Sequence, residues 1–323
     1  MKHPPYPLRA NKAVDRFMLI EVIRRLERTG DISEYTYYGV GGPYLEDFRL
    51  LYEFYPSVGM VSIEEESATY RRQKFHRPCG SAKLKLVHTD LKSFLARYEA
   101  KDRKSVFWLD HTRLTYGVFE DFRVLLGKVA DRSVIKVTLR AEPSDYWDPD
   151  ALPEKDRQRR EKFVSEFSAI LPTPTTEPPD GFEPLAGLLQ DMLQISAQQA
   201  LPSGIGRVVQ ALSSFCYADG AGMLTFTCMV CPEEHRGAIR GQFRQWRFRN
   251  LDWGKPRKID VPFLRTKERL RLQEFLPCER RAGSVLVKAL GYIIDEDRRK
   301  SVAKMSQYAD FHGYYPYLVR AIP

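Results

Sequence analysis

The sequence predicts an α/β protein built around a mostly parallel sheet with helices on both faces. Two observations predict this fold. Over residues 12–141, stretches rich in β-branched and aromatic residues alternate with stretches whose apolar residues recur at helical spacing. The strand-like stretches, such as "SVFWLD", are apolar over most of their length, which is typical of strands buried on both faces of a parallel sheet.

The elements follow one another regularly in the first part of the chain. A leading helix is expected over residues 12–28, where basic residues precede Gly30. Five strands are expected at residues 34–39, 58–63, 82–88, 105–110 and 133–141. Four helices are expected between them, at residues 43–55, 67–76, 91–100 and 118–130. Gly42 would cap the first of these four, with Pro43 at its first position, where a backbone N–H is not needed.

The pattern becomes irregular after residue 142. A charged helix is expected over 154–171, before the proline-rich "PTPTTEPPDGFEP". A strand is expected at 221–231, and "QWRFRNL" and "KIDVPFL" would form a hairpin around "DWGKP". We predict one composite domain with three parts: an α/β half at 1–142, a helical, proline-rich insertion or lid at 143–220, and the last strands with a basic C-terminal extension at 221–323.

Composition predicts a cytoplasmic protein that does not insert into a membrane. The chain has 323 residues, of which 43% are hydrophobic and 29% charged, as in ordinary globular proteins. No apolar run reaches the length of a membrane span, and "MKHPPYPLRANKAVDR" lacks an apolar signal core. The five cysteines are scattered, which fits free thiols in a reducing compartment.

The net charge of +9 lies in one late segment. Residues 236–271 contain twelve Lys or Arg and three Asp or Glu, a surplus of nine, so the rest of the chain sums to zero. Arginines at helical spacing and interleaved aromatic residues suit phosphate contacts and base stacking. A solvated basic surface explains the same pattern. The candidates for binding nucleic acid or another anion are Arg236, Arg240, Arg244, Trp246 and Arg247.

Glycines or acids stand at the ends of the first four predicted strands. Gly39, Gly41 and Gly42 follow the first strand, and Glu64, Asp90 and Asp110 stand at the ends of the next three. Ligands of parallel α/β sheets bind beyond the carboxyl ends of the strands. Glu64 is placed to accept hydrogen bonds from a ribose diol, and Asp90 from an adenine amine. Glu64 and Asp90 also have structural alternatives, since acids favour helix starts and Asp is a common helix N-cap.

The spacing of the glycines favours one nucleoside ligand over another. A dinucleotide site needs G-x-G-x-x-G, but bulky Tyr44 occupies the place of the third glycine. S-adenosylmethionine carries no phosphate, so it needs the glycine turn and the acids at the strand ends without that third glycine. We therefore expect S-adenosylmethionine as the cofactor.

Four motifs in order, "LRANKAVDR", "GVGGPYLEDFR", "VSIEEESATYRRQKF" and "FWLDHT", resemble a bacterial family described as putative O-methyltransferases. This family belongs to the class I S-adenosylmethionine-dependent methyltransferases. The resemblance covers residues 8–140 and implies a Rossmann-like, seven-stranded sheet, with the cofactor over Gly39–Gly42, Glu64 and Asp90, and transfer to an oxygen. The chain departs from the usual pattern at Tyr37, where an acid is common, and at Pro43, where a glycine is common; Glu46 or Asp47 is a candidate replacement for the acid.

For catalysis we expect Asp110 at the reacting centre and His111 as the base that takes the acceptor's proton, unless His111 is only a turn residue. The fourth strand ends "LDHT", unlike the Asn/Asp-Pro-Pro-Tyr of enzymes that methylate DNA base amines. No spacing of ligands supports a metal, and Cys228 of "CMVC" is expected in the sheet core.

Two alternatives remain beside an O-methyltransferase whose acceptor is unknown. One is a nucleic-acid-directed methyltransferase that uses the 236–271 segment, or an enzyme acting on an anionic small molecule. The other is an inactive protein that keeps the fold and works as an interaction partner, because Tyr37 and Pro43 depart from the usual glycine loop. Asn11, Lys12 and Asp15 either close over the site or cap the first helix.

Overall fold

The computed structural model describes residues 9–28, 30–78, 83–100, 103–147, 153–173, 176–278 and 281–315. The chain forms two compact units. The larger comprises Leu19–Cys216 and Gly222–Arg257, and the smaller comprises Met1–Met18, Tyr217–Ala221 and Lys258–Pro323. Helix α1 (Ala10–Glu27) is divided between them after Met18. Among the described residues, no helix combines the length and the apolar character that a membrane span requires.

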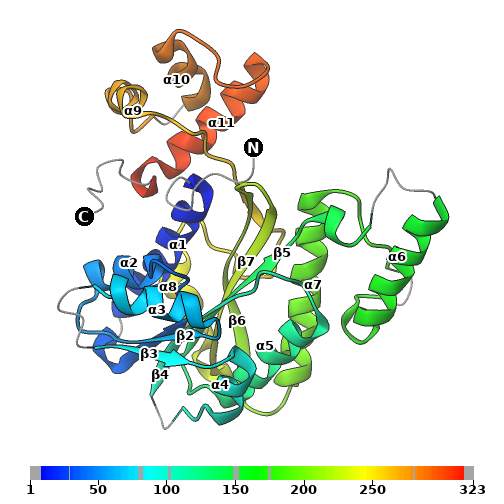
Figure 1. Ribbon diagram of the computed structural model, residues 1–323. Coiled ribbons are helices and arrows are strands. Elements are labelled where there is room, and N and C mark those ends of the chain that lie inside the picture. Colours follow the sequence, from blue (N-terminus) through cyan, green and yellow to red (C-terminus); the bar gives the residue numbers. More distant parts are fainter. Residues whose placement is uncertain are drawn as a thin grey trace. The chain divides into compact units, whose positions relative to one another are not determined.

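The described residues form one eight-stranded sheet, drawn as arrows in Figure 1. Its strands are β1 (Tyr35–Gly39), β2 (Gly59–Glu64), β3 (Leu84–His88), β4 (Lys104–Asp110), β5 (Val134–Arg140), β6 (Arg207–Ala218), β7 (Gly222–Pro232) and β8 (Arg257–Ile259). Their order in the sheet is β3-β2-β1-β4-β5-β7-β6-β8. Strands β1 to β5 run parallel, and β7 runs antiparallel to β5. The expected mostly parallel sheet is confirmed, with one strand more than the seven implied by the resemblance.

Helices of the larger unit cover both faces of its strands. The larger unit contains α2 (Glu46–Phe54), α3 (Ser67–His76), α4 (Leu91–Arg97), α5 (Tyr116–Lys128), α6 (Pro153–Phe167), α7 (Phe182–Ala200) and α8 (Arg236–Phe243). Helices α2 and α3 lie on one face, where Phe48 contacts the ring of Tyr37 and Gln73 bonds Ser62. Helices α4, α5 and α7 lie on the other, as Figure 1 shows.

The main hydrophobic core lies on the face covered by α5 and α7. It joins Phe119, Phe122 and Leu189 of these helices to Phe107 and Phe226 of the sheet, each at most 1% exposed. The alternate residues of β4 and β5 point to the opposite face, because side chains alternate along a strand. Cys228 of β7 is fully buried, which confirms its expected place in the sheet core.

Two local predictions were wrong. Helix α2 begins at Glu46, not at Pro43, and its N-cap is Leu45 in the left-handed conformation, with φ 54°. The turn after β1 therefore extends over Val40–Leu45 before the helix starts. The expected hairpin around "DWGKP" is absent, since residues 245–251 form turns and irregular chain and only Arg257–Ile259 is a strand. The aromatic residues that suggested a strand are core residues of irregular chain: Trp246 and Phe248 are both 3% exposed.

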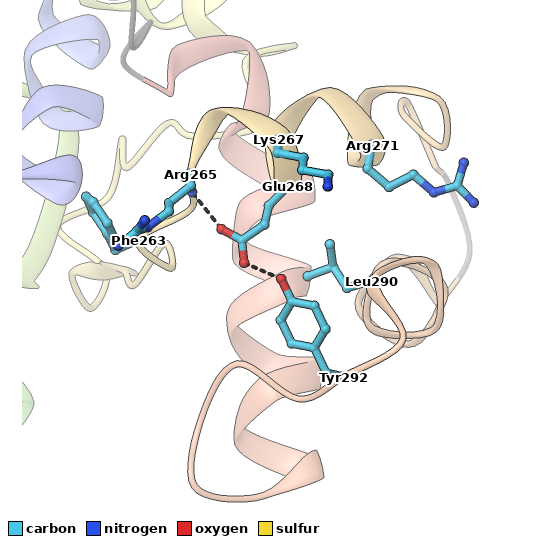
Figure 2. A pocket seen from close by; sticks show the side chains of 7 residues that line it. All are labelled: Phe263, Arg265, Lys267, Glu268, Arg271, Leu290 and Tyr292. Atoms are coloured by element: carbon cyan, nitrogen blue, oxygen red, sulfur yellow. Dashed lines mark hydrogen bonds between the residues drawn. The ribbon is translucent and has the colours of Figure 1, made fainter.

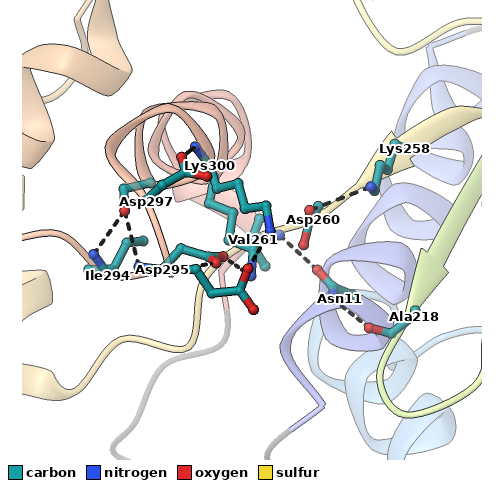
Figure 3. A network of polar contacts seen from close by, with 12 residues as sticks. Asn11, Ala218, Lys258, Asp260, Val261, Ile294, Asp295, Asp297 and Lys300 are labelled. Carbon is teal, nitrogen blue, oxygen red and sulfur yellow. Dashed lines mark hydrogen bonds and ion pairs between the residues drawn. The ribbon is translucent and has the colours of Figure 1, made fainter.

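The smaller unit holds α9 (Thr266–Gln273), α10 (Ala282–Leu290), α11 (Arg298–Phe311) and the start of α1. Within it, Asn11 is 6% exposed and fastens α1 to two other segments (Figure 3). Its amide nitrogen donates to Ala218 O at 3.3 Å and Asp219 Oδ1 at 3.0 Å, and its oxygen accepts from Val261 N at 2.9 Å. Asp219 Oδ2 also accepts from Lys12 N at 2.8 Å, near the positive end of the helix. Asn11 and Lys12 thus anchor the start of this helix.

Candidate functional site

The strand order places the candidate residues at one position of the sheet. From β1 the chain adds β2 and then β3 on one side, whereas β4 and β5 lie on the other. Strand order therefore reverses between β1 and β4, and open α/β sheets bind ligands at the carboxyl edge beside such a point. The turn after β1 begins at Gly39, on this edge. The larger unit thus has a defined location for a ligand site.

The register fixes how two of the acids lie beside that turn. Gly39 pairs with Ser62 of β2 and with Trp108 of β4. Glu64 and Asp110 each follow two residues later, so both extend past Gly39 and share its face of the sheet. Neighbouring strands are about 4.8 Å apart, so the backbones of Glu64 and Asp110 stand about 10 Å from each other across β1. Two carboxylates therefore flank the glycine turn.

Gly41 and Gly42 are needed for different reasons. A Cβ on Gly41 would lie 2.6 Å from Leu45 Cδ2 and 2.7 Å from Phe48 Cε2, which is too close. Gly42 has φ +53°, a conformation that costs other residues energy, but a Cβ there would meet nothing within 4 Å. The turn is thus packed tightly against α2 at one glycine and open at the next.

We expect these two glycines to respond differently to alanine. Gly41→Ala should destabilise the protein by about 1–3 kcal/mol, because Leu45 and Phe48 must move to admit the methyl group. Gly42→Ala should cost roughly 1 kcal/mol, from backbone strain alone. Urea denaturation of both variants measures the difference. A larger loss for Gly42→Ala than for Gly41→Ala would contradict this account of the turn.

Glu64 is held in place by its neighbours. Its side chain is 7% exposed, and burial raises the pKa of its carboxyl group. Glu66 N donates to Glu64 Oε1 at 2.9 Å. The carboxamide of Gln73 from α3 lies 3.5 Å from Glu64 Oε2, donates to Gly42 O at 3.0 Å and accepts from Ser62 Oγ at 3.1 Å. Gln73 is fully buried and links the acid of β2 to the glycine turn of β1.

The sequence did not single out Gln73, although one signal was available. The α3 sequence "SATYRRQKFH" has so few apolar residues that a polar side chain had to fill its buried side. Of the three consecutive glutamates, Glu66 is the N-cap of α3 and accepts from Ala68 N at 2.9 Å and Thr69 N at 2.6 Å. The acid cluster thus divides into a buried acid, an exposed neighbour and a helix cap.

Asp90 has the structural role that was its alternative. It is the N-cap of α4 and accepts from Ser93 N at 2.7 Å. Hydrogen bonds from Ser93 lower the pKa of its carboxyl group, so it is ionised at neutral pH. A carboxylate has about four lone-pair sites. Capping and accepting a hydrogen bond from a ligand are therefore compatible at this position.

Asp110 is the last residue of β4 and His111 follows it, next to a buried polar layer. Trp108 Nε1 donates to Thr138 Oγ1 at 2.8 Å, and the ammonium of Lys136 lies 4.4 Å from the Trp108 ring. These three residues are at most 2% exposed, so they hold this end of the strand rigidly. The Nε2 atom of His111 is buried without a hydrogen-bond partner among the described residues. Burial lowers the pKa of His111 to about 4, against the opposing effect of Asp110, so the ring is neutral at pH 7.

Of the residues expected to bind nucleic acid, one is buried and two form contacts within the chain. The ring of Trp246 is 3% exposed and is not open to base stacking. Arg236 Nε donates to Gln210 Oε1 at 3.0 Å. Arg240 donates to Leu251 O at 2.8 Å and pairs with Asp252 at 2.7 Å. These arginines connect α8 to the sheet and to a following loop. Arg236, Arg244 and Arg247 are exposed.

The late part of the basic segment lines a pocket in the smaller unit. The pocket has a volume of about 580 Å³ and is lined by Phe263, Arg265, Lys267, Glu268, Arg271, Leu290 and Tyr292 (Figure 2). Glu268 accepts hydrogen bonds from Arg265 N at 2.7 Å and from Tyr292 Oη. Phe263 is 59% exposed. This pocket combines cations with an exposed aromatic ring. The sequence analysis expected that combination at residues 236–247 instead.

The parallel sheet, its point of reversed strand order and the acids beside a glycine turn are typical of Rossmann-like proteins that bind a nucleoside cofactor. The family comparison gives the particular group. The model of the family described as "Putative O-methyltransferase" matches residues 4–323, so the chain belongs to this family. Membership implies S-adenosylmethionine as the methyl donor; the acceptor is not identified.

Solved structures resemble the chain at low sequence identity. A transferase from Pyrococcus horikoshii is 10% identical, with a TM-score of 0.33, and the match covers 65% of this chain and 62% of that one. A plantazolicin methyltransferase in complex with SAH is 10% identical, with a TM-score of 0.37 and coverage of 67% and 84%. A probable spermidine synthase from Corynebacterium glutamicum is 11% identical, with a TM-score of 0.41 and coverage of 78% and 82%. No curated protein matches the chain.

Proposed function

We propose that the chain binds S-adenosylmethionine at the carboxyl edge of β2, β1 and β4 and transfers its methyl group to an oxygen atom. One observation carries the location: Glu64 and Asp110 flank the turn that begins at Gly39, where strand order reverses. The cofactor supplies an electrophilic methyl group on a sulfonium. The protein contributes mainly by holding donor and acceptor in line.

The buried carboxylate of Glu64 suits a ribose diol. Its two oxygens can accept from two neighbouring hydroxyl groups, and Glu66 N and Gln73 fix its orientation. Asp90 would accept from the adenine amine while it caps α4. The open side of Gly42 admits a ligand close to the backbone. Gln73 is a positioning residue, because its side-chain amide nitrogen contacts both Gly42 O and Glu64 Oε2 and holds the turn and the acid in place.

His111 is the proposed base. A buried ring nitrogen without a hydrogen-bond partner is unfavourable, and an acceptor hydroxyl that displaces the side chains covering Nε2 and donates to it would remove that cost. The neutral ring can then take the hydroxyl proton as the methyl group is transferred. Asp110 beside it would stabilise the resulting imidazolium, because an opposite charge favours the protonated form.

The experiment that tests this function uses a methyl-labelled donor. The full chain is incubated with S-adenosylmethionine labelled in its methyl group and with cell extract fractionated into small molecules, nucleic acid and protein. We expect label to enter one fraction, and Asp110→Asn to reduce the incorporation. Label in no fraction, from a protein shown to bind the donor, would support the inactive interaction protein instead.

A further inference from the structure

Helix α3 and strand β3 form the most one-sided charged stretch of the larger unit that we find. Residues 67–89 contain six basic residues and no Asp or Glu. They are Arg71, Arg72, Lys74, Arg77, Lys83 and Lys85. The chain outside 236–271 has a net charge of zero, so acids elsewhere in the chain offset these six cations in the net charge. A locally positive surface attracts polyanions whatever the net charge elsewhere.

Part of this stretch lines a pocket of about 550 Å³. Its lining consists of Tyr70, Lys74, Arg77, Leu84, Lys85 and Leu86, three of them cations and none an acid. The ammonium of Lys74 lies 4.5 Å from the centre of the Tyr70 ring, which is stacked on His88 at 4.8 Å and 15°. The Tyr70 ring, held by its stacking on His88, positions the ammonium of Lys74. Arg77 donates to Leu84 O at 2.6 Å. The pocket is therefore ordered and positively charged.

Phe75 lies on the neighbouring side of the same helix and is 86% exposed. It is the most exposed large hydrophobic side chain of the described residues. Arg71 and Arg72 precede it by four and three residues, so they share its side of α3. The guanidinium of Arg72 lies 4.9 Å from the centre of the Tyr44 ring and donates to Tyr44 Oη at 2.7 Å. An open aromatic ring on a helix that also carries cations is an arrangement on which unstacked bases pack beside their phosphates.

A structural explanation accounts for only part of this surface. Strand β3 is at the edge of the sheet, and lysines on an edge strand discourage pairing with other chains. That role explains Lys83 and Lys85. It does not explain the cations of α3 or the 86% exposed ring of Phe75 beside them.

We propose that the α3–β3 surface docks a single-stranded nucleic acid that carries the methyl acceptor. Charge complementarity selects a polyanion, and the open ring of Phe75 selects unstacked bases over a duplex. The surface belongs to the same unit as the candidate site: Leu84 of the pocket and His88, which pairs with Glu64, are four residues apart, or about 13 Å along β3. This inference rests on the proposed function, because it names the acceptor class of that site.

The test measures binding of labelled single-stranded oligouridylate and oligothymidylate to the full chain by fluorescence anisotropy. With three or four phosphate contacts, raising salt from about 50 to 200 mM should weaken binding roughly 20- to 50-fold. The double variant Lys74→Gln, Lys85→Gln should reduce the slope of log affinity against log salt by about 1.4. Phe75→Ala should weaken binding about 5- to 150-fold and leave the salt slope unchanged.

The matched control is Phe263→Ala with Lys267→Gln, which removes the same residue types from the pocket of Figure 2. We expect this control to bind both oligonucleotides as the unaltered chain does. Loss in the control but not in the α3–β3 variants would overturn the proposal and assign binding to the smaller unit. Tighter binding of duplex than of single strands, or binding of neither, would also overturn it.

Titration with S-adenosylhomocysteine on the same proteins separates the two proposals. The α3–β3 variants should bind it unchanged, which also shows that they are folded. If the unaltered chain binds S-adenosylhomocysteine but neither oligonucleotide, the docking proposal fails and the proposed function stands. If it binds neither, both fail. A preference between the uridylate and thymidylate strands shows whether the partner is RNA or DNA.

Discussion

Glu64→Gln should weaken the binding of S-adenosylhomocysteine by about 2–3 kcal/mol, or roughly 30- to 150-fold, because hydrogen bonds to a charged acceptor are worth more than those to a neutral one. The amide keeps the size of the side chain, and its oxygen can still accept from Glu66 N, now at 2.9 Å from Glu64 Oε1. The fold should therefore survive the change. Isothermal titration measures the dissociation constant.

The neighbouring acid provides the control for this prediction. Glu65 is exposed, whereas Glu64 is 7% exposed on the face of the sheet that bears Gly39. Glu65→Gln removes the same charge one residue away and should leave affinity within a factor of about two, as expected for a solvated group. Equal losses in the two variants would mean that only general electrostatic attraction was measured, and would refute the assignment of Glu64 to the ribose.

His111→Gln should lower the rate of methyl transfer by about 10²- to 10⁴-fold, the usual contribution of a general base. Glutamine can still hydrogen-bond the acceptor but cannot take its proton. Because burial lowers the pKa of His111 to about 4, the rate should show no loss from His111 protonation between pH 7 and 5. A rate that falls through pH 6.5 would show an ordinary, solvated histidine. The assay uses the labelled donor and the fraction that accepts label.

The same histidine should make the free energy of unfolding depend on pH, whether or not the protein is active. Between pH 6.5 and 4 the unfolded chain binds a proton at this residue and the folded chain does not, so stability falls as pH falls. The loss across this interval is on the order of 3 kcal/mol at 1.36 kcal/mol per pH unit. His111→Gln removes the titrating group and should flatten this part of the curve. Identical pH curves of urea unfolding for both proteins would contradict the buried, neutral state.

The sequence predicted β1 to β5 and β7 well because their signals are local, but it missed β6, which lies in the stretch 143–220 that was expected to be a helical insertion or lid. β-branched strands, helical spacing and strand-end acids each depend on a few neighbouring residues, and strands β1 to β5 lie where they were expected. Glu64 was predicted at the end of β2 because it directly follows the strand-like stretch 58–63. The glycine turn was predicted only in part, since the helix start at Glu46 depends on the packing of Leu45 and Phe48 against Gly41.

The features that sequence analysis missed depend on contacts between distant segments. Gln73 matters because α3 packs on β2 beside the turn of β1, which no spacing within α3 indicates. Trp246 was expected at the surface because it stands among arginines, but the fold buries it under the cation of Arg25, 4.7 Å from its ring. Charge summed over the whole chain likewise concealed the α3–β3 surface.

Hydrogen–deuterium exchange with and without S-adenosylhomocysteine tests the central claim most directly, because it locates the ligand without an acceptor. The account predicts slower exchange in four segments at the carboxyl edge of the sheet: 39–46 after β1, 64–67 after β2, 89–93 after β3 and 110–114 after β4. Protection confined to other segments, such as 263–292, or no protection at saturating ligand, would contradict the proposed site.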